Sequence, residues 1–115
     1  SNLGFGLLGY IFERASGKSY EELVQTYVSL KLGLKNTTTK PTGDQKALVA
    51  TPYRKENRAY ETKPFKMGKL VSAGGIFSSV SELSNLMVNQ MAAYQSYSNG
   101  KEAGPLVLTK QKKHF

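Results

Sequence analysis

The feature that most constrains the fold is a glycine-rich apolar stretch close to the start of the chain. Over residues 3–16, apolar residues recur at helical spacing and form one broad face made of Leu3, Leu7, Leu8, Ile11 and Phe12. Glycines at positions 4, 6 and 9 interrupt this stretch, and each costs an isolated helix about 1 kcal/mol relative to alanine. Because glycine lets another backbone come very close, we expect a helix that is pressed against a neighbouring segment and ends at Gly17.

The apolar face of this helix needs a partner surface. Burying one leucine, isoleucine or phenylalanine side chain is worth about 1.5 to 3 kcal/mol, so leaving the face in water forfeits roughly 5 to 10 kcal/mol. A loss of that size is comparable to the whole stability of a small domain. We therefore expect the remainder of a larger enzyme, or another copy of the chain, to cover Leu3, Leu7, Ile11 and a later helix over residues 80–94.

The composition allows one small domain or a part of a larger one, because the chain has 115 residues. Hydrophobic residues make up 39% of it and aromatic residues 10%, which favours folding over disorder. No apolar run approaches the roughly 20 residues that a transmembrane helix needs. The chain has no cysteine and one histidine, His114. A histidine-based metal site and a histidine-centred catalytic triad within this chain are thereby excluded.

Residues 1–33 are predicted to form two helices. The second helix begins with a capping box, in which Ser19 is the N-cap and Glu22 the third helical residue, and it ends at Gly33. Helical spacing predicts that its buried face carries Leu23, Val24, Tyr27, Val28 and Leu30.

Residues 34–71 are predicted to form an irregular basic loop with a small β-hairpin. Short alternating runs at 47–50 and 60–62 are the expected strands. Over residues 40–69, eight lysines or arginines stand against three acidic residues, which gives this loop much of the chain's net charge of +8.

Residues 72–95 are predicted to form a turn and a helix. A tight turn is expected at 72–75, followed by a second capping box at Ser79 and Glu82. The helix that follows is expected to bury Val80, Leu83, Met87, Met91 and Tyr94. Residues 96–115 are a tail with a turn signal at Asn99-Gly100. The predicted fold class is therefore α+β, mainly helical with one small hairpin.

Four motifs in order resemble the middle segment of the serine β-lactamase-related family, which includes class C β-lactamases, DD-carboxypeptidases and esterases. A Tyr-x-Asn motif opens a glycine-rich helix in that family, and a Ser-Gly-Lys turn, a Leu-Gly-x-x-x-Thr stretch and an Ala-Gly-Gly segment follow. The matching stretches here are 1–9, 16–23, 32–37 and 73–83. The resemblance covers most of residues 1–95 and implies a fragment of a single, larger β-lactamase/transpeptidase-like domain.

The resemblance implies a serine hydrolase that acts through an acyl-enzyme on a β-lactam, a peptide or a simple ester. In the family, a Ser-x-x-Lys pair supplies the nucleophile and its activating base. A tyrosine shuttles protons, an asparagine binds the substrate amide, and backbone N–H groups form an oxyanion hole. Of these residues only the asparagine maps onto this chain, as Asn2, so we expect the chain itself to be inactive. No metal or organic cofactor is implied, and a periplasmic or extracellular location is typical of the family.

Asn2 has alternative interpretations at this point. It could simply be the N-cap of the first helix, or Ser1-Asn2 could be the remnant of a cleaved purification tag. Three other motif matches are better interpreted as solvent-exposed structure. They are Ser98-Asn99-Gly100-Lys101, where Asn-Gly favours a turn over a helix, Tyr97-Ser98-Asn99, and Lys40-Pro41-Thr42-Gly43, where proline disfavours a central strand.

Two other classes of function remain open for the chain as given. Its apolar faces are also typical of a non-catalytic protein-interaction module. The basic loop, with aromatic residues interspersed, has the composition of a nucleic-acid-binding segment. However, lysine outnumbers arginine 13 to 3, and no nucleic-acid-binding motif is recognisable. A solvated basic surface with no specific nucleic-acid partner is the favoured interpretation of this loop.

Overall fold

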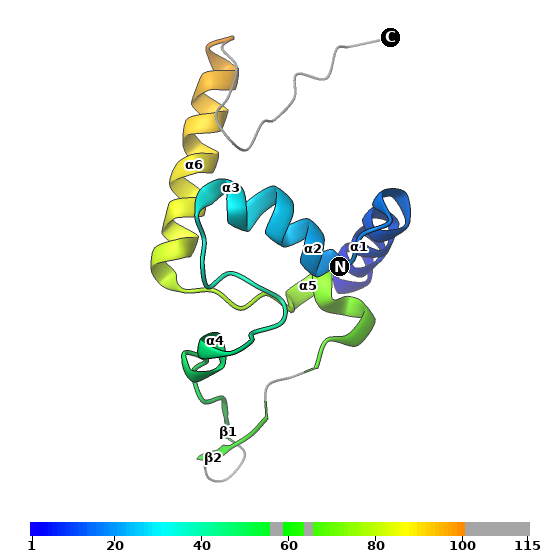
Figure 1. The fold of residues 1–115 in the computed structure, drawn as a ribbon, viewed down its shortest axis with the longest axis vertical. Coiled ribbons are helices and arrows are strands. Elements are labelled where there is room, and N and C mark those ends of the chain that lie inside the picture. The colour runs from blue at the N-terminus through cyan, green and yellow to red at the C-terminus, as the bar shows by residue number, and fades with distance from the viewer. Residues whose placement is uncertain (56–58, 64–65, 101–115) are drawn as a thin grey trace.

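The computed structural model describes residues 1–55, 59–63 and 66–100 (Figure 1). The described part is mainly helical with one two-stranded antiparallel hairpin, which confirms the predicted α+β class. In chain order the elements are α1 (Asn2–Ser16), α2 (Tyr20–Val24), the π-helix η1 (Gln25–Ser29), α3 (Leu30–Leu32), α4 (Asp44–Ala47), β1 (Tyr53–Lys55), β2 (Ala59–Glu61), the 3₁₀-helix η2 (Gly68–Leu70), α5 (Val71–Gly74) and α6 (Val80–Ser98). Among the described residues, no helix is both long and apolar enough to cross a membrane.

Helix α1 is capped at both ends. At its start the Ser1 Oγ accepts a hydrogen bond from the Gly4 N–H at 3.4 Å, so Ser1 is the N-cap and Asn2 is the first helical residue. The interpretation of Asn2 as the N-cap is therefore wrong. At its end Gly17 adopts the left-handed conformation with φ 69°, as the sequence predicts.

Two of the three glycines in α1 allow the close approach predicted for them. Gly6 and Gly9 are buried against η2 and α5. A Cβ atom added at Gly6 would lie 2.5 Å from the Leu70 Cδ2, and one added at Gly9 would collide with the Ser72 side chain. The Ser72 Oγ donates to the Phe5 carbonyl at 2.8 Å across the same contact. A Cβ atom added at Gly4 would have no neighbouring atom within 4 Å. The prediction of a close approach is therefore wrong at Gly4.

The second helix contains a π-helical turn that the sequence pattern does not predict. The Ser19–Glu22 capping box forms as expected, because the Glu22 carboxylate accepts from the Ser19 N–H at 2.7 Å and the Ser19 Oγ from the Glu22 N–H at 3.3 Å. The helix passes through η1 and α3 and ends at Gly33, with φ 65°.

The predicted buried face of this helix is only partly correct. Val24 is buried, but Tyr27 and Leu30 are 50% and 77% exposed, and Ser29 faces inward instead. The physical reason is the wider π turn at 25–29, which adds a residue and rotates the following side chains relative to a regular helix.

The hairpin exists, but its first strand is not where the sequence pattern placed it. Strands β1 and β2 pair with Arg54 opposite Tyr60, so the predicted strand at 60–62 overlaps β2. The predicted strand at 47–50 is wrong, because residues 44–47 form α4. Asp44 in the first turn of α4 favours this helix start through the helix dipole.

The second half of the chain also departs from prediction at two places. Residues 71–74 form the short helix α5 rather than a tight turn at 72–75, and Gly75 has an ordinary φ of −93°. At α6, Ser79 is the N-cap as predicted, but the Glu82 carboxylate does not return to the Ser79 N–H. It binds residues 36 and 37 instead, so the second capping box is only half formed.

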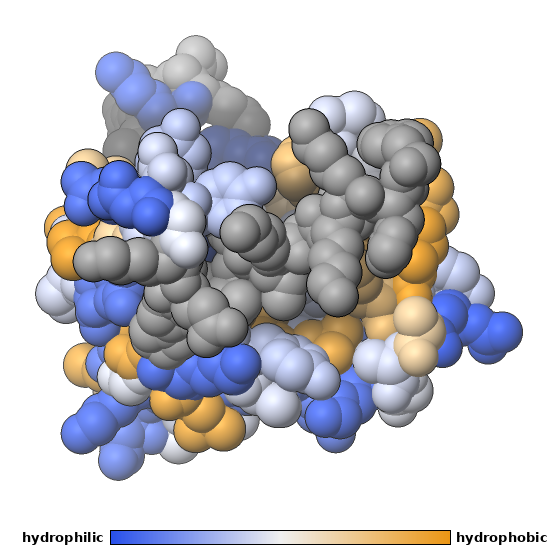
Figure 2. All heavy atoms as spheres, turned by 90° about the horizontal axis from the view of Figure 1, so that it is seen from above, coloured by the Kyte–Doolittle hydropathy of each residue, from blue (hydrophilic) through white to orange (hydrophobic). Residues whose placement is uncertain are grey.

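The apolar faces of α1 and α6 are open to solvent within this chain. The expected burial on α6 is wrong, since five apolar side chains are 47% to 82% exposed, namely Val80, Leu83, Met87, Met91 and Tyr94. On α1, Leu3 is 75% exposed. Figure 2 shows exposed hydrophobic side chains (orange) beside hydrophilic ones (blue) on one face of the molecule. Buried hydrophobic residues among the described ones are Val24, Leu34 and Ala93. That a further surface covers these faces stays a prediction.

The close contact at Gly9 makes a testable prediction about stability. Gly9→Ala should lower the free energy of unfolding by about 1 to 3 kcal/mol, because the added methyl group collides with Ser72. Gly4→Ala, in the same helix and without a neighbour, should raise it by up to about 1 kcal/mol. Urea unfolding followed by circular dichroism measures both. Equal effects of the two substitutions would contradict the assigned contact.

Candidate functional site

A polar junction between α2 and the segment 36–39 fixes one side of the candidate site. One oxygen of the Glu21 carboxylate accepts hydrogen bonds from the Thr38 Oγ1 at 2.7 Å and the Gln25 Nε2 at 2.9 Å. The other oxygen accepts from both the N–H and the hydroxyl of Thr39. The Gln25 Nε2 also donates to the Thr37 carbonyl at 2.9 Å. Glu21 and its neighbour Gln25 therefore hold three consecutive threonines against the second helix.

These hydrogen bonds determine the ionisation of Glu21. Partial burial of the Glu21 side chain acts to raise its pKa. Hydrogen bonds from Thr39, Thr38 and Gln25 act in the opposite direction, because they are made to the charged form. The net result is a Glu21 pKa below its ordinary value of 4.5.

A second carboxylate, from α6, holds the other end of the same segment. Glu82 accepts from the Asn36 N–H at 2.9 Å and from the Thr37 hydroxyl. Since the Thr37 hydroxyl has only one proton, the Ser78 Oγ at 2.8 Å must donate to it. Thr38 and Phe77 exchange two backbone hydrogen bonds, at 3.0 and 2.8 Å. The junction therefore fixes residues 77–78 as well as α6.

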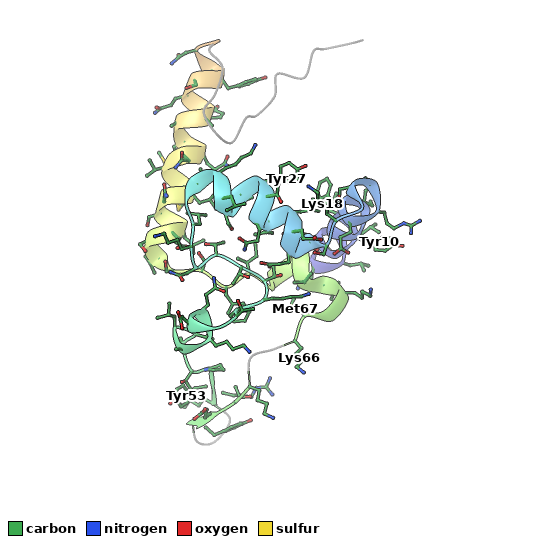
Figure 3. All side chains as sticks on the ribbon, viewed as in Figure 1. Tyr10, Lys18, Tyr27, Tyr53, Lys66 and Met67 are labelled. Carbon is green, nitrogen blue, oxygen red and sulfur yellow. The ribbon has the colours of Figure 1, made fainter. Side chains whose placement is uncertain are left out.

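An open groove lies beside this junction. It runs between α1, the start of α2, Lys63 and residues 66–71, and its volume is about 1050 Å³. Its apolar lining includes Leu3, Leu7, Tyr10, Leu70 and Phe77. Figure 3 labels Tyr10 on α1, and Lys66 and Met67 on the segment that leads into η2. The two carboxylates that line the groove, Glu13 and Glu21, both already accept hydrogen bonds.

Asn2 lies at the N-terminal end of α1. It is exposed in the first helical turn, next to Leu3, which lines the groove, but Asn2 is not itself in the lining. Its side chain makes no hydrogen bond to any residue of the described ranges. Helix α1 itself packs against η2 and α5. The Asn2 side chain is thus exposed at the end of a helix that is packed at its middle.

The other motif matches do not assemble into a site. Ser98 is the last residue of α6, while Lys101 and His114 lie outside the described residues. Residues 40–43 form irregular backbone ahead of α4. Within the described ranges, no group of three or more acidic or histidine side chains could hold a metal ion.

The residues that sequence reasoning missed are the two carboxylates of the junction. Glu21 and Glu82 are each in the first turn of a helix, and the pattern assigned Glu82 to capping alone. The available signal was the run of three threonines at 37–39, which supplies hydroxyl donors to any nearby acid.

Comparison with known proteins identifies the family. Residues 1–113 match the family model described as Beta-lactamase. The chain belongs to the β-lactamase family. Two curated relatives are D-alanyl-D-alanine-carboxypeptidase/endopeptidase AmpH from Escherichia coli K12 and from Escherichia coli O157:H7, each 28% identical over 93 residues. Each match covers 81% of this chain and 23% of the relative. The chain therefore spans about a quarter of the length of these relatives, and the family resemblance of its motifs is confirmed.

The lowered pKa of Glu21 predicts how stability depends on pH. A depressed pKa in the folded state stabilises the fold above the unfolded-state value, and this stabilisation is lost as pH falls through the folded pKa. Glu21→Gln should reduce stability near pH 7 and flatten its decline below about pH 4.5. The measurement is the free energy of unfolding from about pH 7 to pH 3. Gln90→Ala, which truncates an exposed side chain on α6, is the control and should leave the decline as steep as in the wild type. A wild-type slope in Glu21→Gln would contradict the role of Glu21.

Proposed function

We propose that this chain is a substrate-binding segment of a serine hydrolase that works through an acyl-enzyme. The observation that carries the proposal is the family match over residues 1–113. The position of Asn2, exposed in the first turn of a helix that packs against η2 and α5, supports it further. In this proposal Asn2 contacts the substrate amide, and the four parts 1–33, 34–71, 72–95 and 96–115 belong to one larger β-lactamase-like domain.

The proposed reaction has two steps. A serine hydroxyl attacks the substrate carbonyl while a lysine one helical turn away takes its proton, and the leaving group departs with a proton to give an acyl-serine. Water then attacks the acyl carbonyl and regenerates the serine. Among the described residues, no helix carries a Ser-x-x-Lys pair. We therefore propose that other residues of the enzyme supply the serine and lysine and that the chain alone is inactive.

Asn2 suits a positioning role in that reaction. Its side chain offers both N–H donors and a carbonyl acceptor, and a substrate amide has one donor and one acceptor. Helix α1, whose first turn carries Asn2, packs closely against η2 and α5, with Gly6 and Gly9 at the contact. The substrate is a β-lactam, a peptide or a simple ester, and the carboxypeptidase/endopeptidase name of the relatives favours a peptide.

A non-catalytic interaction module is a second candidate function. The exposed apolar faces of α1 and α6 favour it, since Leu3 and Val80 are 75% and 82% exposed. The two functions are compatible for this chain, because a segment of an enzyme also needs partner surfaces for its apolar faces.

The inactivity of the isolated chain can be tested by labelling. The 115-residue chain should not be acylated by a fluorescent penicillin or by a fluorophosphonate, because no helix of its described residues carries a Ser-x-x-Lys pair. Denaturing gel fluorescence and intact mass spectrometry measure this, with the full-length AmpH relative as the positive control. Stoichiometric labelling, above all labelling that disappears in Ser98→Ala, would show that the chain holds its own nucleophile.

The role of Asn2 can be tested in a chimera. Residues 1–113 would replace the corresponding segment of the Escherichia coli AmpH relative, and carboxypeptidase activity would be measured as kcat/KM. Asn2→Ala should lower kcat/KM by about 10² to 10³, which is typical for the loss of one substrate-directed donor. Gln90→Ala, which truncates another exposed side-chain amide, on α6, is the matched control and should have little effect. Equal activity of the two variants would refute the assignment of Asn2, with matched melting curves showing that both are folded.

A further inference from the structure

The first turn of α1, which carries Asn2, has little stabilisation of its own. Its N-cap hydrogen bond, from the Gly4 N–H to the Ser1 Oγ, is 3.4 Å long, which is beyond the usual range for an N–H···O bond. No acidic residue lies in this turn to interact with the helix dipole, and Gly4 and Gly6 lower the helical propensity. Such a turn frays unless a contact from outside the helix holds it.

A contact of that kind comes from Ser72 on α5. The Ser72 Oγ donates to the Phe5 carbonyl at 2.8 Å. The Phe5 N–H in turn donates to the Ser1 carbonyl at 3.1 Å, and this carbonyl belongs to the peptide unit that joins Ser1 to Asn2. Two hydrogen bonds therefore lead from the Ser72 hydroxyl to the backbone of Asn2.

The absence of a side chain at Gly9 gives the Ser72 hydroxyl access to α1. A Cβ atom at Gly9 would collide with the Ser72 side chain, so a larger residue there would push the hydroxyl away from the Phe5 carbonyl. A carbonyl inside an α-helix already accepts from the N–H four residues later, and the Ser72 hydroxyl is an additional donor. Gly9 thus lowers the helical propensity of α1 but permits this hydrogen bond between helices.

The segment that carries the donor is itself anchored. Helix α5 ends with a hydrogen bond from the Gly75 N–H to the Val71 carbonyl at 2.7 Å. Shortly after α5, Phe77 exchanges two backbone hydrogen bonds with Thr38, within the polar junction between α2 and α6. Ser72 therefore links the first turn of α1 to a hydrogen-bonded part of the structure.

We propose that Ser72 is a positioning residue for Asn2. Its hydroxyl holds the first turn of α1, so that the Asn2 side chain keeps one orientation toward the substrate amide. The inference rests on the proposed function of Asn2, and Ser72 itself contacts no substrate. Displacing a substrate-directed group is costly, since a shift of about 1 Å can reduce a rate about 10²-fold.

The test compares two substrates in the AmpH chimera that carries residues 1–113. One is the carboxypeptidase substrate, and the other is p-nitrophenyl acetate, an ester without an amide. Ser72→Ala should lower kcat/KM about tenfold for the peptide and less than about twofold for the ester, because only the peptide presents an amide to Asn2. A loss of folded enzyme would lower both values by the same factor. Equal losses, or no loss with the peptide, would overturn the proposal.

Ser84→Ala is the matched control. The Ser84 Oγ donates to the Val80 carbonyl at 2.9 Å within α6, so this substitution also removes a hydroxyl bonded to a helix carbonyl, but away from α1. It should change kcat/KM for either substrate less than about twofold. A preferential loss with the peptide as large as that of Ser72→Ala would refute the specific role of Ser72.

A double variant separates this inference from the proposed function. Ser72→Ala added to Asn2→Ala should cause no further loss with the peptide, because Ser72 acts only through Asn2. A further loss of about tenfold would refute the route through Asn2 and leave the proposed role of Asn2 intact. Full activity of Asn2→Ala alone would refute the proposed function and this inference with it.

Hydrogen exchange tests the contact without reference to activity. In the same chimera, Ser72→Ala should speed amide exchange at the start of α1 at least about threefold and leave α6 unchanged, because the lost bond held only the first helix. Mass spectrometry of the peptic fragments that cover residues 1–8 and 80–98 measures this. Unchanged exchange at residues 1–8 would show that Ser72 does not hold the turn, whatever the role of Asn2.

Discussion

The structure depends on one short polar segment that two carboxylates hold from opposite sides. Residues 36–39 carry buried hydroxyls, with Thr37 and Thr38 only 5% and 3% exposed, and buried polar groups are costly unless they are hydrogen-bonded. Glu21 from α2 and Glu82 from α6 supply those bonds, and hydrogen bonds to an ionised group are the stronger kind. Through the segment they join two helices that are about 60 residues apart in sequence. Hydrogen bonds to this segment thus connect helices that, in most domains, are connected by a shared apolar core.

The distribution of apolar residues follows from this polar junction. Val24, Leu34 and Ala93 are the buried hydrophobic residues of the described ranges, while the larger apolar side chains of α1 and α6 lie outside. A typical domain has only about 5 to 15 kcal/mol of net stability, most of it derived from apolar burial. This arrangement, with buried polar side chains hydrogen-bonded and apolar faces open, agrees with the proposal that the chain is part of a larger β-lactamase-like domain.

Structural features that depend on a few adjacent residues could be predicted from the sequence, and features that depend on long-range contacts could not. The ends of α1, the Ser19–Glu22 box and the stop at Gly33 were predictable, since each depends on a few adjacent residues. The π turn at 25–29 and the use of Glu82 by a segment 46 residues away were not, because no local pattern encodes the partner. Asn2 was proposed as a substrate-binding residue through the family resemblance alone, and that assignment stays a prediction.

Helix α1 links the packing of the chain to the role proposed for Asn2. Asn2 is in its first turn, and Gly6 and Gly9, further along the same helix, lie against η2 and α5. A Cβ atom at Gly9 would collide with the Ser72 side chain, so a larger residue there requires α1 and α5 to move relative to each other. Because Asn2 belongs to the same helix, a substitution at Gly9 is expected to affect both stability and the position of Asn2, whereas Asn2→Ala leaves the contacts of Gly6 and Gly9 in place.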